Sequence, residues 1–484
     1  MSFENPECIP PRVRARRATL AVLAIATSLS GCRAPERITV ATERTISDVA
    51  RLEEVLEFRV VGEDGVPIDE PAPVGGALSL AEAVRLAVTT APDLQAALAR
   101  VRLAAAEADQ ARLLPNPVLG VVFRAGEGRP QIEASFAQEF VRALVRPRAA
   151  SAADNRLRAA SADAVVTALD TIREVQEDYA SAQSWAALLP LLEERLELVG
   201  RLASTARARL DAGEGTRGDV VTLDAQRVQL EVTIDLARLE ERTSRIGLAR
   251  RIGRPSSEAT WDLEPWSSTP FESLSEDAWT EAALGARPEI QAIVWRLAAL
   301  GDEAALVSSL PWQGAGAGLE AQKSDGWQAG PSLSTPLPVF DDGSARRARN
   351  DAERLEARHE LTSVQRRVVE EVRVAYRSLL ASRANLTRIR TELIPLQVER
   401  RRLAEDAYRA GVTDVTQLFL AEQDLRIAQT QAIEIALRAE LSLVRLQRAV
   451  GGPAVVERTA RVPARAEGVL AATNDVALSA GSVR

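Results

Sequence analysis

Four short motifs in this chain occur twice, and the members of each pair are separated by nearly the same number of residues. Pro92-Asp-Leu returns 196 residues later as Pro288-Glu-Ile. The other three pairs lie 196 to 198 residues apart and contain Leu114 and Leu310, Gly213 and Gly411, and Pro255 and Pro453. This period is longer than that of solenoid repeats, which is about 20–50 residues. The chain is therefore predicted to contain two copies of one large unit.

The repeat gives the predicted domain organisation. The first unit covers residues 77–255 and the second covers residues 256–453. A linker, residues 32–76, precedes them, and a tail, residues 454–484, follows them. Each unit is predicted to contain a helix, a β-hairpin and a long helical hairpin, in this order.

The hairpins show alternating apolar and polar residues. Each unit opens with a predicted helix, residues 79–114 and 276–310, and the hairpins follow at residues 117–140 and 313–338. Membrane-spanning strands are about 9–11 residues long and alternate in this way, with apolar side chains toward lipid. A soluble hairpin packed on a helix shows the same alternation, so the pattern alone leaves both interpretations open. In the second strand, one face has Ile132, Ala134 and Phe136, and the other has Glu133 and Ser135.

Long helical stretches follow both hairpins. Residues 148–210 are predicted to form one helix of about 90 Å at 1.5 Å per residue. Both stretches end at a glycine, Gly213 or Gly411, as helix C-termini commonly do. A second helix then returns, over residues 218–251 and 414–449. Each unit therefore ends in an antiparallel helical hairpin with its tip near the glycine.

The composition excludes several function classes. The residues are 46% hydrophobic but only 4% aromatic, with much Ala and Leu, which is typical of long helices. A net charge of −8 does not favour nucleic-acid binding. His359 is the one histidine and there is no Cys-x-x-Cys, so no metal site and no cofactor is expected. His359 is interpreted as a solvated helix residue. No catalytic motif is apparent, so the chain is not expected to be an enzyme.

The N-terminus has the features of a targeting segment. A basic stretch precedes an apolar run that is shorter than the roughly 20 residues of a membrane-spanning helix. Residues 1–31 are therefore predicted to be a secretory signal peptide. The ending Leu29-Ser-Gly-Cys32 resembles the bacterial lipobox, which implies cleavage before Cys32 and a lipid on that cysteine. Arg33 follows instead of an aspartate, which favours the outer membrane. An ordinary signal peptide beside an unmodified cysteine is the alternative.

Four strands cannot close a barrel. An open sheet edge in lipid leaves backbone groups unpaired, at a cost of several kcal/mol each. Three copies would give a twelve-stranded barrel, which is wider than the roughly eight-stranded barrels that side chains fill. The predicted fold is therefore mainly α with transmembrane β: a duplicated unit of helix, β-hairpin and long helical hairpin, whose trimer forms a twelve-stranded β-barrel continued by an α-helical barrel.

The order and duplication of these segments resemble the TolC-like outer membrane efflux proteins, of the lipoprotein type. The segments that carry the resemblance begin at Leu80 (Leu-Ala-Glu-Ala-Val), Leu114 (Leu-Pro-Asn-Pro), Pro336 (Pro-Leu-Pro-Val-Phe) and Tyr408 (Tyr-Arg-Ala-Gly-Val-Thr-Asp). The second and third look most like the heavy-metal, CzcC-like branch. The resemblance implies a homotrimeric exit duct that exports small molecules or metal ions. It also implies a periplasmic adaptor (membrane fusion protein) and an inner-membrane pump as partners. The expected location is the outer membrane, with a lipid anchor and a large periplasmic part.

The resemblance also implies functional positions. Adaptor docking is expected at the tip glycines, Gly213 and Gly411, although both can also be plain helix ends. The family's gate is often ringed by acidic residues, but the corresponding positions here are Gln417 and Leu420. The gate candidates are therefore Asp219, Asp224, Asp414 and Gln417. Carboxylates near a helix N-terminus more often cap the helix, which is the alternative for them.

A second function class remains open. A lipid-anchored periplasmic coiled-coil scaffold or adaptor without a pore would contain the same amphipathic helices. Such a protein does not require two pairs of alternating strands at matching offsets, so the channel is the favoured interpretation.

Overall fold

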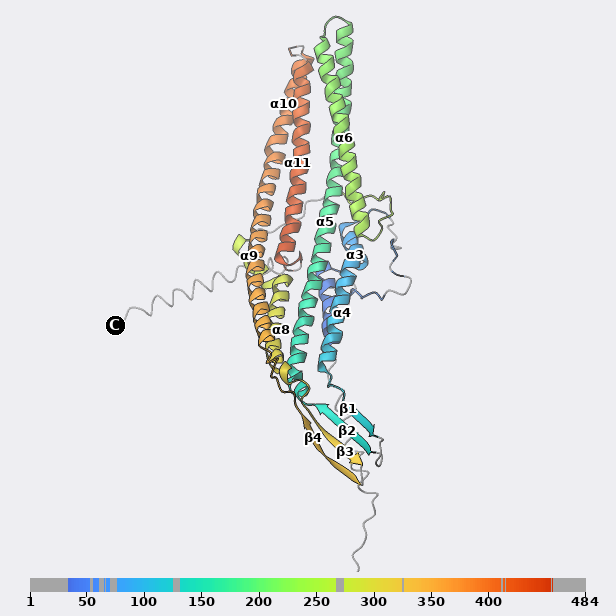
Figure 1. Ribbon diagram of the computed structural model, residues 1–484. Helices are drawn as coiled ribbons and strands as arrows, with labels where there is room; N and C mark the ends of the chain where they lie inside the picture. The colour runs from blue at the N-terminus through green and yellow to red at the C-terminus, as the bar shows by residue number, and fades with distance from the viewer. Residues whose placement is uncertain are drawn as a thin grey trace, which may run out of the picture.

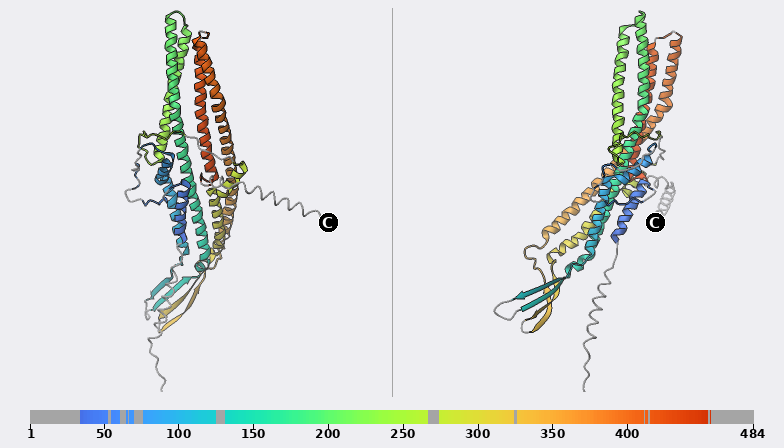
Figure 2. Two further views of the ribbon diagram at one scale, coloured as in Figure 1. Left: turned by 180° about the vertical axis from the view of Figure 1, so that it is seen from behind. Right: turned by 90° about the vertical axis from the view of Figure 1, so that its right-hand side faces the viewer.

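The computed structural model describes residues 34–52, 55–60, 65, 67–69, 76–124, 131–266, 274–323, 326–410, 412–413, 415–453 and 455. The molecule is elongated, with a β-sheet at one end and the tips of two helical hairpins at the other (Figure 1). Both views in Figure 2 show the hairpins standing side by side and pointing away from the sheet. The predicted signal peptide, Cys32 and nearly all of the predicted tail lie outside the described residues.

From α3 onward, the two halves of the described chain follow the same order of helix pair, strand pair and helical hairpin. The first half contains α2 (Ala34–Ala50), α3 (Leu80–Thr90), α4 (Pro92–Arg112), β1 (Val118–Arg124), β2 (Gln131–Glu139), α5 (Val141–Asp211) and α6 (Arg217–Arg251). The second half contains α7 (Glu276–Ala286), α8 (Pro288–Ser309), the 3₁₀ turn η1 (Leu310–Trp312), β3 (Gly316–Lys323), β4 (Trp327–Ser334), α9 (Ser344–Arg388), the π turn η2 (Ile389–Leu393), α10 (Ile394–Arg409) and α11 (Val415–Val450).

The opening helix of each half is divided in two. Ala91 and Arg287 have extended ψ angles of 116° and 121°, and a new helix starts at the following proline. A proline disfavours the helical conformation of the residue before it, because its ring carbon clashes with that residue. The prediction of single helices over residues 79–114 and 276–310 is wrong at these positions.

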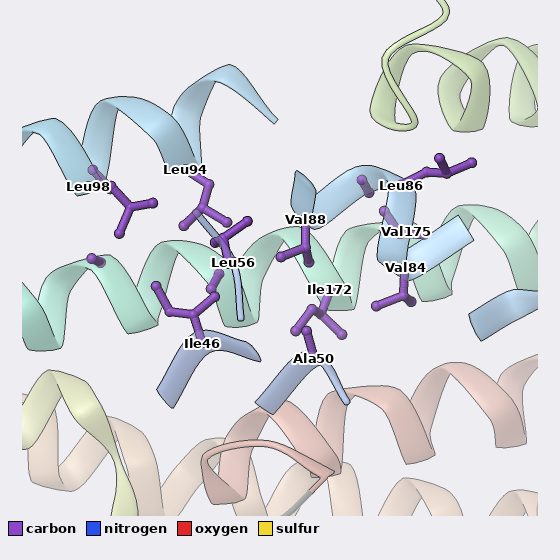
Figure 3. Packing of buried hydrophobic residues seen from close by; sticks show 14 of the residues in the cluster. Ile46, Ala50, Leu56, Val84, Leu86, Val88, Leu94, Leu98, Ile172 and Val175 are labelled. Carbon is purple, nitrogen blue, oxygen red and sulfur yellow. The ribbon is translucent and has the colours of Figure 1, made fainter. Parts of the chain in front are cut away.

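The predicted linker contains a helix that the sequence analysis did not predict. Helix α2 packs against α4 and α5, and Ile46 is fully buried between them (Figure 3). Glu43 pairs with Arg102 of α4 at 2.9 Å. The hydroxyl of Ser47 accepts a hydrogen bond from the N–H of Leu56 at 2.6 Å. The segment after Cys32 is therefore part of the first core.

Helix α5 is longer than predicted. It has 71 residues, about 107 Å at 1.5 Å per residue, and it starts directly after β2, not at residue 148. Pro147 and Pro190 lie inside it. In the second half, the π turn η2 ends two residues before Pro395. Proline removes one backbone donor, and a π turn is a common way for a helix to accommodate such a gap.

The four strands form one antiparallel sheet in the order β1-β2-β3-β4. The β2–β3 pairing joins the two halves, with Phe136 opposite Leu319. Strand β4 ends at Ser334, four residues before the predicted end of the hairpin at residue 338, since Pro336 and Pro338 lack the N–H that a ladder needs. Strand β3 ends at Lys323, where it lies opposite Trp327 of β4.

Two equivalent cores lie where the helices meet. In the first, Leu94 of α4 and Ile172 of α5 pack with α2 residues (Figure 3). Trp279 of α7 is fully buried in the second, against Val368 and Val372 of α9. These cores hold the sheet and the hairpins at opposite ends of one stiff body.

Candidate functional site

The first helical hairpin turns between α5 and α6. Gly213 has a positive φ of 77°, and its N–H donates to the carbonyl of Leu210 at 3.0 Å. The N–H groups of Glu214 and Gly215 donate to the carbonyl of Arg209 at 2.8 and 3.0 Å. Glycine is favoured here because it adopts a positive φ without the backbone strain of a residue with a side chain, and this conformation lets the turn satisfy the last carbonyls of the helix. Gly213 thus ends the helix, and its predicted docking role stays a prediction.

A second glycine in this turn, Gly215, was not identified from the sequence. A Cβ on Gly215 would lie 2.9 Å from the backbone nitrogen of Leu210 and 3.1 Å from the carbonyl carbon of Arg209. Both are backbone atoms, so no side-chain rotation relieves the contact. A Cβ on Gly213 would meet no atom within 4 Å. The Gly-Glu-Gly spacing directly after the helix was the signal that could have identified this position.

The second tip lies between α10 and α11. Gly411, Asp414 and the side chain of Asp219 lie outside the described residues. The N–H of Val412 donates to the carbonyl of Ala407 at 3.0 Å, so the chain turns directly after α10. The docking role of Gly411 and the gate roles of both aspartates stay predictions.

The other two gate candidates are described. Asp224 of α6 pairs with Arg207 of α5, so it braces the two helices of the first hairpin. The hydrogen bond that Arg207 donates to Asp224 raises the pKa of Arg207. Gln417 is exposed in the first turn of α11. Neither the ion pair of Asp224 nor the exposure of Gln417 shows whether these residues form a gate, so their gate roles stay predictions.

Ion pairs join the two halves along the face shared by α5 and α11. Arg448 of α11 reaches Asp170 of α5 at 2.9 Å and Glu289 of α8 at 2.6 Å. Burial lowers the pKa of Arg448, but the hydrogen bond that Arg448 donates to Asp170 and the charge of Glu289 outweigh burial, so this pKa is raised. Closer to the tips, Arg426 pairs with Glu194 at 2.6 Å. The two hairpins therefore form one continuous wall.

The register of the strands sorts their side chains onto two faces. On one face, a row crosses the whole sheet as Leu119, Phe136, Leu319 and Pro331, and the next row is Val121, Ala134, Ala321 and Ala329. On the other face, the rows are Gly120, Ser135, Glu320 and Gly330, and Val122, Glu133, Gln322 and Gln328. The sheet is apolar on one side and largely polar on the other.

The polar face carries charge near its middle. Glu133 pairs with Arg124 at 2.8 Å. Glu320 is exposed, has only Gly and Ser beside it in its row, and has no cationic partner among the described residues. Glu320 therefore gives the centre of this face a negative charge.

Helix α6 has apolar residues on two opposite sides. Leu230, Ile234 and Ala237 are buried in the core of the first hairpin. The residues half a turn away are exposed, and they are Val221, Val228, Val232, Leu236, Leu239 and Ile246. A second apolar stripe on a helix indicates a second packing partner.

The opposite edge of the molecule is also apolar. Helix α6 packs on α5, α5 on α11, and α11 on α9 and α10, so α6 and α9–α10 are the two edges (Figure 1). Helices α9 and α10 expose Val374, Leu396 and Leu403. The molecule therefore has two unpartnered edges, each with exposed apolar side chains.

Other kinds of site were considered in the described part of the chain. Its His, Cys, Asp and Glu side chains form no group of three or more that could hold a metal ion. His359 is exposed on α9. Among the described helices, none combines the length and the apolar character needed to cross a membrane.

The comparisons with known proteins agree with this architecture. Residues 279–452 match the family described as outer membrane efflux protein. The second half of the described chain, from α7 to α11, therefore has the sequence pattern of this family. It is 25% identical over 307 residues to the outer membrane efflux protein BepC of Brucella suis biovar 1, an alignment that covers 61% of this chain and 64% of BepC. The chain thus aligns with somewhat less than two thirds of this relative.

Two solved structures have the same fold. The outer-membrane channel OprN is 21% identical, with a TM-score of 0.65 over 77% of this chain and 90% of OprN. The outer membrane protein VceC of Vibrio cholerae is 19% identical, with a TM-score of 0.65 over 77% of this chain and 96% of VceC. At these identities the likeness establishes the fold.

Proposed function

We propose that this protein is the outer-membrane exit duct of a tripartite efflux system, which carries small molecules or metal ions from the periplasm and an inner-membrane pump to the exterior. The observation that carries the proposal is the sheet, which is apolar on one face, polar on the other and open at both edges. A strand set of this kind is suited to a water-filled barrel in lipid. The helical hairpins at the opposite end would extend the duct through the periplasm.

A homotrimer would supply the missing partners. The apolar stripe of α6 on one copy would pack against α9 and α10 of the next, and β4 of one copy would pair with β1 of the next. A head-to-tail contact of this kind forms a ring when its rotation closes. Three copies give a twelve-stranded barrel and a closed tube of helices, without free edges. The repeated order of elements supports two duplicated units per copy, residues 77–255 and 256–453.

A lipid on Cys32 fits the position of α2. Helix α2 runs antiparallel to α4, because Glu43 lies beside Arg102 while the N–H of Arg59 donates to Gln95 at 2.9 Å. Its first residue therefore lies toward the sheet, and Cys32 precedes that residue by two positions. Two residues span at most about 7 Å. An acyl chain on Cys32 would thus be attached beside the end of α2 that points toward the sheet.

The tips at Gly213 and Gly411 are the proposed docking surface for the periplasmic adaptor. The proposed gate lies beside them, at Asp219, Asp224, Asp414 and Gln417. The tips support this because they lie farthest from the sheet (Figure 2). The heavy-metal branch remains the proposal for the cargo, and the susceptibility of a deletion strain to metal salts and to organic toxicants tests it.

Planar-bilayer conductance of the detergent-purified mature protein, with its mass in detergent, tests the duct. A trimer that inserts and conducts is expected. A water-soluble monomer without conductance would overturn the duct and favour the periplasmic scaffold or adaptor.

A further inference from the structure

The two helices that leave the sheet begin with several arginines. Helix α5 starts at Val141 and α9 starts at Ser344, and neither has an acidic residue in its first turn. The arginines concerned, called the arginine collar below, are Arg142, Arg146 and Arg148 of α5 and Arg346, Arg347 and Arg349 of α9. The N-terminus of a helix carries a partial positive charge, so cations are unfavourable there. The positive charges of the collar are therefore unfavourable beside the N-termini of both helices.

Carboxylates of the same chain neutralise the collar only in part. Arg346 pairs with Asp341 at 2.6 Å, and Arg349 pairs with Glu353 at 2.7 Å. Arg142 reaches Glu139 only at 3.8 Å. Arg347 reaches Asp342 only at 3.9 Å. No carboxylate among the described residues pairs with Arg146 or Arg148. The collar thus retains a net positive charge, and its arginines are exposed except for Arg146, which is half-buried.

Exposed apolar side chains lie among these arginines. Leu144 of α5 projects into solvent, and so do three residues of the segment between β4 and α9: Leu337, Val339 and Phe340, the last of them fully exposed. Leu333, at the end of the apolar face of β4, is exposed as well. Apolar side chains interleaved with arginines are typical of surfaces that lie at the headgroup level of a membrane.

The distance from the sheet fits this level. Arg142 and Arg148 lie about 2 to 11 Å along α5 from its first residue, at 1.5 Å per residue. The headgroup layer on each side of a bilayer is about 5–8 Å thick. Side chains on a helix lean toward its N-terminus, so the guanidinium groups lean back toward the sheet. With the strands in the hydrocarbon, these groups lie among the lipid headgroups.

We propose that the arginine collar binds the phosphate groups of anionic phospholipids in the leaflet that faces the helices. Guanidinium groups bind phosphate with two parallel hydrogen bonds. The experiment below distinguishes this lipid from a contact between subunits. This inference rests on the proposed function, which places the strands in a membrane.

The experiment compares the full-length protein with Arg146→Gln/Arg148→Gln. These two side chains are chosen because no internal ion pair is lost with them. Arg201→Gln is the matched control, since Arg201 is also exposed on α5 but lies far from the sheet and pairs with Glu197. Arg146→Lys/Arg148→Lys keeps the charge.

Each protein is reconstituted into vesicles of phosphatidylethanolamine alone or mixed with phosphatidylglycerol. Retained lipid is counted by native mass spectrometry, and the thermal midpoint of the trimer is measured.

The wild type and Arg201→Gln are expected to retain phosphatidylglycerol and to gain thermal stability from it, and salt should weaken both effects. The Gln double variant should retain several-fold less of this lipid and lose the gain, while remaining at least as stable as the wild type without it. The Lys variant should keep part of the effect.

Two results would overturn the inference. One is equal phosphatidylglycerol dependence in the wild type and the Gln variant. The other is a Gln variant that falls apart even without this lipid, because the collar would then be a contact between subunits. A wild type that conducts but shows no preference for phosphatidylglycerol would disprove lipid binding by the collar and leave the proposed duct standing. A wild type that neither inserts nor conducts would disprove the proposed duct as well.

Discussion

The hydroxyl of Tyr179 donates a hydrogen bond to the carbonyl of Leu78 at 2.8 Å and accepts one from the N–H of Glu264 at 3.2 Å. In the second half, Tyr376 donates to the carbonyl of Leu274 at the same distance of 2.8 Å. Tyr179 thus links α5 to the residues just before α3, and Tyr376 links α9 to the residues just before α7. Burial raises the pKa of Tyr179, consistent with a neutral hydroxyl as the donor.

Tyr179→Phe and Tyr376→Phe are expected to destabilise the protein by about 1–3 kcal/mol each, because buried backbone groups lose their partner. The two tyrosines belong to separate clusters without shared residues, so the effects should add in the double variant. Denaturant or thermal unfolding of the purified protein measures them. A double variant no less stable than the wild type would show that water replaces both hydroxyls.

The turn of the first hairpin gives a second prediction. Gly213→Ala should cost about 1–2 kcal/mol, because φ is positive there. Gly215→Ala should cost at least as much, since its Cβ meets backbone atoms. Gly200→Ala is the control within α5, where a Cβ meets nothing within 4 Å and alanine should stabilise by about 0.5–1 kcal/mol. Thermal midpoints measure all three. Equal effects at the three positions would contradict the turn geometry.

The exposed stripe of α6 gives a third prediction. Leu236→Glu should prevent trimer formation, since it places a charge where the next copy is proposed to pack. Thr233→Glu adds the same charge to another exposed position of α6, about 100° around the helix from Val232 of the stripe, and it should leave the trimer intact. Mass in detergent separates trimer from monomer. A Leu236→Glu protein that remains trimeric would rule out this edge as the interface.

The polar face of the sheet predicts ion selectivity. With three copies, Glu320 would place three carboxylates around the lumen, so the channel should prefer cations. Glu320→Gln should reduce this preference, seen as a smaller reversal potential in a KCl gradient. Lys323→Gln changes a charge on the opposite face and should have no effect. An unchanged reversal potential in Glu320→Gln would place the selective charges elsewhere.

The outer end of the sheet can be located chemically. Lys323 is the one lysine of the chain and follows the apolar face at the end of β3. Its ammonium lies 5.9 Å from the ring centre of Trp327. A membrane-impermeant amine reagent applied to intact cells should label Lys323, and Lys323→Arg should abolish the labelled peptide. Labelling that requires broken cells would reverse the proposed orientation.

The sequence predicted the helix and strand bounds that depend on the pattern of neighbouring residues. The alternation in residues 131–140 predicted β2 to within one residue, and the glycine of the first tip predicted the end of α5 to within two residues. The breaks at Ala91 and Arg287 were missed although Pro92 and Pro288 were recognised as repeat landmarks, because the conformational effect of proline on the preceding residue was not applied.

Other features depend on tertiary contacts. Helix α2 is stabilised by burying Ile46 against two distant helices, which no local pattern reveals. The pairing of Arg448 with Asp170 joins residues far apart in the sequence. The tyrosines were detectable in principle, since Tyr179 and Tyr376 have nearly the repeat offset.

Helix α2 also sets a length. Its 17 residues span about 25 Å, with the proposed lipid site just before one end and the buried core residues Ile46 and Ala50 near the other. With Cys32 acylated as proposed, the length of α2 fixes the distance between the membrane surface and the middle of the molecule. Removing one turn would force the chain either to pull its acyl chain out of the leaflet or to withdraw its apolar residues from the core. The anchor and the core of the first half would therefore be completed together during assembly.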